Sequence, residues 1–90
     1  MARFAVELVF GPDREKRLSV RPEHREYITS LAEKGVVLAS GPYADDAGAL
    51  IIYEAADEAE ARALIAADPY TAAGVVADLQ LREWKVVFAA

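Results

Sequence analysis

Apolar residues recur along this chain with two different periods, and the order of the two periods restricts the fold more than any other feature. Residues 3–10 alternate between apolar side chains and others, as in a half-buried strand. Residues 36–39 and 49–53 are short and almost wholly apolar, which favours buried strands. Residues 22–34 instead carry apolar side chains at helical spacing, with charges at many of the other positions.

Proline and aspartate indicate where these elements begin and end. Pro22 suits the first turn of a helix, so residues 14–17 are expected to form a solvated loop before it. Asp57 can cap a second helix, which reaches about Ala67 and is stopped by Pro69. The expected elements are strands at residues 3–10, 36–39, 49–53 and 77–87, and helices at residues 22–34 and 58–67.

This order predicts an α+β fold of the ferredoxin-like βαββαβ type. Such a fold has a four-stranded antiparallel sheet with two helices on one face. The chain has 90 residues, which is enough for one domain over residues 1–90. We expect the two helices to run roughly parallel, since each returns the chain from the same kind of strand end.

The second face of the sheet bears on the state of assembly. The helices can cover only one face of the sheet. If the other face of an antiparallel sheet is exposed to solvent, it should carry polar side chains. Residues 36–39 and 49–53 have no polar face. On the second face of the first strand, Ala5 and Val9 are apolar and alternate with charged residues. We therefore expect a homodimer, or a higher oligomer, whose sheets pack face to face. The alternative is a monomer with an apolar outer face, and Trp84 fits either the core or an interface.

Composition argues against several classes of function. The chain has 10 Lys and Arg against 15 Asp and Glu, a net charge of −5, so it offers no basic stripe for nucleic acid. It has no cysteine and one histidine, which leaves no disulfide, no thiolate nucleophile and no His-rich metal site within one chain.

Targeting and cofactor motifs are equally sparse. The apolar start of the chain is interrupted by Glu7, unlike a signal peptide, and no apolar run approaches the ~20 residues of a membrane span. We therefore expect a cytoplasmic protein with no membrane partner. Glycine-rich phosphate loops and metal-binding signatures do not occur, so no cofactor is expected.

Few side chains could perform acid–base chemistry, and His24 is the single histidine. Its helical phase turns the ring toward the sheet, where it is either a partly buried base or a residue that merely packs. Asp68 precedes Pro69, which holds the aspartate backbone extended and fixes the direction of its carboxylate. Roughly parallel helices would keep Asp68 far from His24, so Asp45 and Asp46 are alternative partners for the imidazole.

Two further groups could bind a small molecule. Arg17 and Arg21 flank the entrance to the first expected helix, and guanidinium groups suit carboxylates. Ser40, Gly41 and Pro42 are expected to end the second strand, where a hydroxyl and a glycine would let a ligand approach the backbone. Both groups have plainer interpretations, as surface charges and as an ordinary turn.

Several short motifs stand in a characteristic order along almost the whole chain. They are Arg17, Arg21-Pro22-Glu23-His24, Tyr27, Leu31, Gly35, Ser40-Gly41-Pro42, Gly48, Asp68-Pro69-Tyr70 and Gly74. In this order and spacing they resemble the YciI-like (YCII-related) family of small bacterial proteins. The resemblance implies a ferredoxin-like fold that pairs as a dimeric α+β barrel.

The resemblance also implies a site. His24 matches the family's active-site histidine and Asp68 its aspartate, with Tyr70 of the same box as a substrate-binding candidate beside Arg17, Arg21 and residues 40–42. Related dimeric barrels handle small aromatic or lactone compounds, and one branch of the family is linked to dehydrohalogenation.

Two functions of different class follow from these observations. The first is a cofactor-independent enzyme in which His24, oriented by Asp68, performs lyase or isomerase chemistry on a small organic molecule. The second is a non-catalytic ligand-binding or accessory dimeric module, in which His24 and Asp68 form only a structural hydrogen bond.

Overall fold

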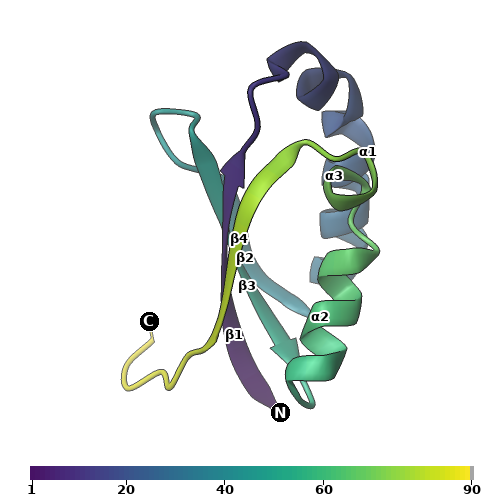
Figure 1. Cartoon of the computed structure of the whole chain (residues 1–90). Coiled ribbons are helices and arrows are strands. Elements are labelled where there is room, and N and C mark those ends of the chain that lie inside the picture. Colours follow the sequence, from purple (N-terminus) through teal and green to yellow (C-terminus); the bar gives the residue numbers. More distant parts are fainter. Residues whose placement is uncertain (90) are drawn as a thin grey trace.

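The computed structural model describes residues 1–89, and all of its helices lie on one side of a single sheet (Figure 1). The sheet has the order β2-β3-β1-β4, and each neighbouring pair of strands is antiparallel. This is the ferredoxin-like α+β fold expected from the sequence. The elements are β1 (Ala2–Phe10), α1 (Arg14–Glu33), β2 (Val37–Pro42), β3 (Gly48–Ala55), α2 (Glu58–Ala66), α3 (Pro69–Ala72) and β4 (Val76–Glu83).

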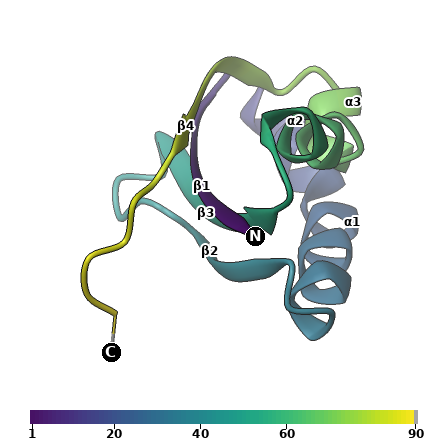
Figure 2. The same cartoon turned by 90° about the horizontal axis from the view of Figure 1, so that it is seen from below.

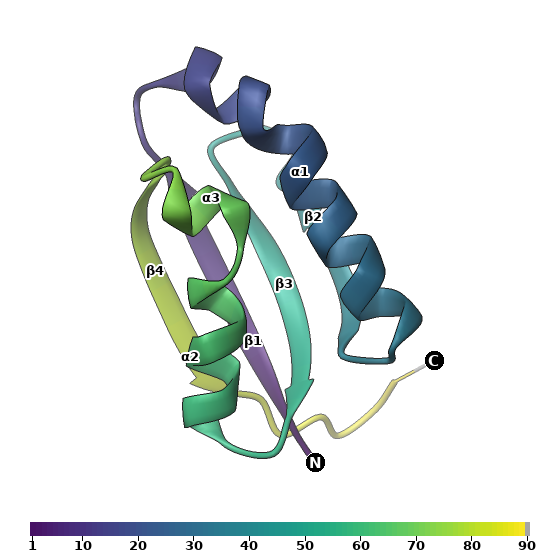
Figure 3. The same ribbon diagram turned by 90° about the vertical axis from the view of Figure 1, so that its right-hand side faces the viewer.

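Helix α1 begins eight residues earlier than the sequence led us to expect. Asp13 is its N-cap, and the Asp13 side chain accepts a hydrogen bond from the backbone N–H of Lys16 at 3.0 Å. The loop expected at residues 14–17 is therefore wrong, because these residues form the first turn of the helix. Pro22 lies inside α1, where it removes one backbone hydrogen bond, and the first turns of α1 lie at an angle to the rest (Figure 3). His24 consequently lies near the middle of the helix.

The two main helices run in opposite directions, so the expectation of parallel helices is wrong. Each helix returns along the sheet against the direction of the strand that it follows. The preceding strands, β1 and β3, are antiparallel neighbours at the centre of the sheet, so α1 and α2 are antiparallel as well (Figure 3). The end of α2 and the short helix α3 therefore lie beside the first half of α1, where α1 and α3 are in contact.

The remaining bounds differ from the expectations by a few residues. Strand β2 continues through residues 40–42 instead of ending there, and the turn is confined to residues 43–47. Gly48 opens β3 against β1, so closely that an added Cβ would collide with the Leu8 carbonyl. Strand β4 ends at Glu83, so the strand expected as far as residue 87 is too long, whereas Asp57 caps α2 as expected.

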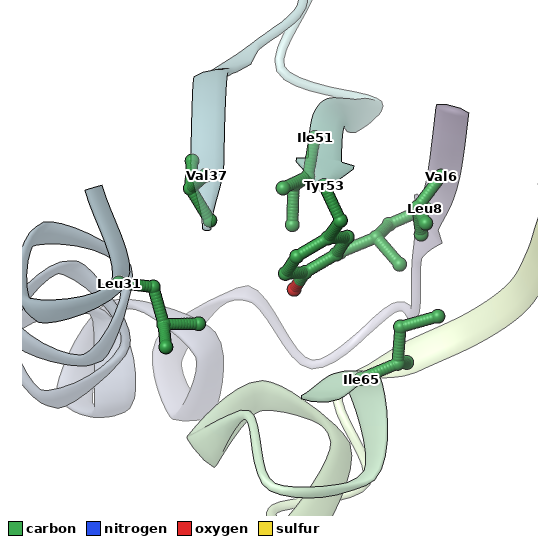
Figure 4. Packing of buried hydrophobic residues seen from close by; sticks show 7 residues of the cluster. All are labelled: Val6, Leu8, Leu31, Val37, Ile51, Tyr53 and Ile65. Carbon is green, nitrogen blue, oxygen red and sulfur yellow. The ribbon is translucent and has the colours of Figure 1, made fainter. Parts of the chain in front are cut away.

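The core lies between the sheet and the helices. Its main cluster surrounds the ring of Tyr53, which points from β3 toward the helices (Figure 4). The Tyr53 hydroxyl is buried and has no hydrogen-bond partner among residues 1–89, and burial raises the pKa of this phenol above its usual range. The cluster consists of Val6, Leu8, Leu31, Val37, Ile51, Tyr53 and Ile65.

The outer face of the sheet carries apolar side chains mainly along β1, β2 and β3. Val9, Leu38 and Leu50 remain 37–44% exposed there, whereas the outward residues of β4 include the polar Gln80 and Arg82. After β4, the C-terminal segment leaves the sheet on the side away from the helices (Figure 2). In residues 1–89, no helix has both the length and the apolar character that crossing a bilayer requires.

Candidate active site

His24 and Asp68 form a buried pair between α1 and α3. The His24 Nδ1 and Asp68 Oδ1 atoms are 2.7 Å apart, although the residues are separated by 44 positions. The two side chains are only 10% and 3% exposed. They meet because His24 lies mid-helix and because α2 delivers Asp68 antiparallel to α1. Parallel helices would have kept His24 and Asp68 apart, whereas the antiparallel helices bring them into contact.

The orientation of Asp68 is set by its own chain segment. Asp68 is the N-cap of α3 with an extended backbone, as expected of a residue before proline. The same Oδ1 that faces His24 accepts a hydrogen bond from the Tyr70 backbone N–H at 2.9 Å. A carboxylate only accepts hydrogen bonds, so Nδ1 of a neutral His24 carries the proton and Nε2 is the basic nitrogen. This is the arrangement of a base held by an orienting acid.

Aromatic contacts hold the plane of the imidazole. The rings of His24 and Tyr70 stack with their centroids 3.9 Å apart and an interplanar angle of 2°. Tyr70 in turn packs edge-on against Phe10, at 5.8 Å and 83°. The His24 ring is therefore fixed both at Nδ1, by Asp68, and over one face, by Tyr70.

Arg17 and Asp46 form a second pair beside the first. Arg17 is 4% exposed, and its guanidinium donates to the two Asp46 carboxylate oxygens at 3.3 and 2.8 Å. These hydrogen bonds lower the pKa of the Asp46 carboxyl and raise the pKa of Arg17. The guanidinium carbon also lies 4.1 Å from the centroid of the Phe10 ring. Asp46 is thus engaged by Arg17, and Asp68 is the carboxylate bonded to His24.

A cavity of about 320 Å³ opens beside these pairs, between α1, the end of β2 and α3. It is lined by every candidate named from the sequence except Asp45 and Asp68, and Asp68, which is bonded to His24, is 2% exposed. Residues 40–42 line it from within β2 rather than from a turn. The candidates that line it are Arg17, Arg21, His24, Ser40, Gly41, Pro42, Asp46 and Tyr70.

Sequence reasoning missed part of this lining. Arg25, Phe10 and Ile28 also face the cavity. Arg25 follows Arg21 by four positions, and this helical spacing was the signal that could have identified it. The signal was overlooked because a helix starting at residue 22 would have left Arg21 outside the helix.

The other features of the described chain are less suited to catalysis. A second, more open hollow of about 480 Å³ lies between α2, α3 and β4, and its charged lining residues are the exposed Arg62 and Asp78. Within residues 1–89, no group of three or more His, Asp or Glu side chains is placed to hold a metal ion. The cavity beside His24 is accordingly the candidate active site.

Comparison with known proteins finds a matching family and similar chains. The family model of the YCII-related domain matches residues 2–85. The proteins called YciI from Escherichia coli O6:H1 and from Shigella flexneri are each 37% identical to this chain, over 82% of it and 86% of theirs.

Solved structures are similar as well. The first is 5-chloro-2-hydroxyhydroquinone dehydrochlorinase from Burkholderia phenoliruptrix AC1100, in complex with 2,5-dihydroxybenzoquinone. It has a TM-score of 0.81 and 26% identity over 92% of this chain and 93% of that one. The second, an antibiotic biosynthesis monooxygenase, has a TM-score of 0.61 and 19% identity over 97% and 99% of the two chains, and shows likeness of fold alone.

Proposed function

The chain belongs to the YCII-related domain family, and on this premise we propose that it is a cofactor-independent enzyme acting on a small organic molecule. The observation that carries the proposal is the 2.7 Å contact between His24 and Asp68 at the wall of a cavity. A single oriented base beside a cavity is sufficient for proton abstraction, which is the first step of lyase and isomerase chemistry.

The reaction needs no external oxidant or reductant. Nε2 of His24 takes a proton from the substrate, and the electron pair of the broken bond forms a new double bond. In an elimination this pair expels a leaving group, such as chloride, from the neighbouring carbon. In an isomerisation the imidazolium returns the proton to another carbon. Asp68 stabilises the imidazolium while it carries the proton.

The burial of the pair favours a second candidate function. His24 is 8% exposed and Asp68 2%, which also suits a hydrogen bond that only ties α3 to α1. In that case the protein is a non-catalytic module that binds a small ligand or a partner protein.

Turnover of chlorinated and hydroxylated aromatic compounds separates the two candidates. The dehydrochlorinase that shares 26% identity with this chain suggests 5-chloro-2-hydroxyhydroquinone as the first compound to assay. We expect chloride release above the spontaneous rate, measured with a chloride electrode, and no loss of rate when EDTA is present. If compounds that bind are never converted, the module is favoured. A rate abolished by EDTA would contradict a cofactor-independent reaction.

We also propose that two copies pack through their outer sheet faces. Leu50 and Leu38 are exposed on that face, and Val87 and Phe88 beyond β4 are 99% and 85% exposed. Apolar surface of this kind gains free energy when a second copy covers it. The cytoplasmic location, the single-domain extent and the lack of a nucleic-acid partner stay predictions of the sequence.

The substitution Leu50→Lys is expected to convert the dimer into monomers. A lysine there meets Glu7 on the neighbouring strand, so the isolated chain accommodates it, whereas a closed interface would bury its charge. Light scattering at micromolar concentration measures the mass. Ala59→Lys, on the exposed surface of α2, is the matched control and should leave the mass at two chains. A wild-type mass of one chain would refute the dimer.

A further inference from the structure

We propose that the cavity beside His24 takes a small organic anion with an apolar body, and that Arg21 and Arg25 bind its negative charge. The inference rests on the proposed function, because it names the class of molecule on which His24 would act. It concerns binding, however, and can be tested without any turnover.

The first support is a row of three arginines on α1. Arg17, Arg21 and Arg25 follow one another at intervals of four residues, so they share one face of the helix. All three line the cavity. The chain as a whole has a net charge of −5, so this local gathering of positive charge runs against its overall balance.

The second support is the unequal pairing of these charges. Arg17 is buried and its charge is balanced by Asp46, in the bidentate contact described above. Within residues 1–89, no ion pair engages Arg21 or Arg25. Like charges four residues apart on a helix repel each other. An anion between the two guanidinium groups would relieve this repulsion, and a guanidinium binds oxyanions through several parallel hydrogen bonds.

The third support is the convergence of the three charges on one point of the cavity. Burial raises the pKa of the Tyr70 hydroxyl, and the positive charges of Arg17, Arg21 and Arg25 each act in the opposite direction. Their fields therefore overlap at Tyr70, the residue stacked on His24. An anion held by Arg21 and Arg25 would consequently lie near the His24 imidazole.

The remaining walls indicate the body of the ligand. Ile28, Pro42 and Ala49 are apolar, and Gly41 leaves room near the backbone of β2. A volume of about 320 Å³ is at the low end for ligand pockets. The cavity therefore suits a compact apolar group, such as one ring, that bears a single anionic function.

The test compares benzoate with benzamide, which have nearly the same shape but differ in charge. Binding is followed by NMR, from the ring resonances of the single histidine and the backbone amides of Ser40 and Gly41, at matched ionic strength. We expect benzoate to bind about tenfold more tightly than benzamide, as one charge-assisted contact would give. Equal affinities, or no shift of these signals by either compound at millimolar concentration, would overturn the inference.

Variants then assign the charge. Replacing both Arg21 and Arg25 by Gln should weaken benzoate binding by about 10- to 100-fold and leave benzamide binding within about twofold. Arg62→Gln, on the exposed face of α2, is the control and should change neither affinity. Equal weakening of both ligands by the double variant would contradict binding of the charge by these arginines.

One more variant separates this inference from the proposed function. His24→Gln should keep the preference for benzoate, read from the amides of Ser40 and Gly41. If wild-type protein prefers benzoate but never converts any compound, the enzyme proposal fails and the anion site stands. If compounds are converted without preference for anions, the reverse holds.

Discussion

His24→Gln lowers kcat/KM of the proposed reaction by about 10²- to 10⁴-fold, the usual contribution of one general acid–base group. Glutamine has no nitrogen that can take up a proton near neutral pH. Its amide N–H can still donate to Asp68, so the buried carboxylate keeps a partner. The substitution therefore removes the chemistry of the imidazole without leaving an unpaired charge in the core.

Two measurements are needed for this variant: steady-state kinetics and the free energy of unfolding in urea. Glu23→Gln is the matched control, because it lies next to His24 on α1 but is exposed and does not line the cavity. We expect the control to retain wild-type kinetics. If His24→Gln unfolds much more easily and the folded fraction keeps full activity, the pair is structural and the base is another group.

The fold could be predicted from local patterns because the pattern of apolar residues within each strand is typical of a strand. In β1, Phe4, Val6 and Leu8 are buried and Glu7 is exposed, as alternation requires. The start of α1 could not be obtained in this way. Pro22 is an acceptable first-turn residue, and it competed with the N-cap Asp13, which lacks a Glu or Gln three residues later to complete a capping box.

The site was predictable in its members but not in its geometry. His24 is the only histidine, and Asp68 stands before a proline, so both are visible in the sequence. Their contact depends on two properties of the tertiary structure, namely where α1 begins and which way α2 runs. Strand pairing determines the second property: once β1 and β3 are known to be adjacent and antiparallel, the helices must be antiparallel as well. Arg25 was missed because the expected helix began at residue 22, after Arg21.

Asp68→Ala should destabilise the protein by about 2–4 kcal/mol, a large share of the ~5–15 kcal/mol typical of a folded domain. Loss of the N-cap of α3 costs about 0.5–2 kcal/mol. The buried Nδ1–H of His24 then lacks a partner, which costs a further ~1–3 kcal/mol. Asp68→Asn should be much milder, because its side-chain oxygen can accept from both His24 and the Tyr70 backbone N–H.

The asparagine variant also distinguishes the charge of Asp68 from its role in orientation. The Tyr70 N–H can only donate, so it holds the asparagine oxygen, rather than its NH₂ group, toward His24. The imidazole then keeps its proton on Nδ1 and loses only the negative charge beside it. We expect kcat to fall by about 10- to 100-fold, since hydrogen bonds to charged groups contribute about 1.5–3 kcal/mol. Urea unfolding and kinetics of both variants measure the two effects. An asparagine variant as unstable as the alanine variant would contradict the shared acceptor, and unchanged kcat would show that the charge of Asp68 has no part in the reaction.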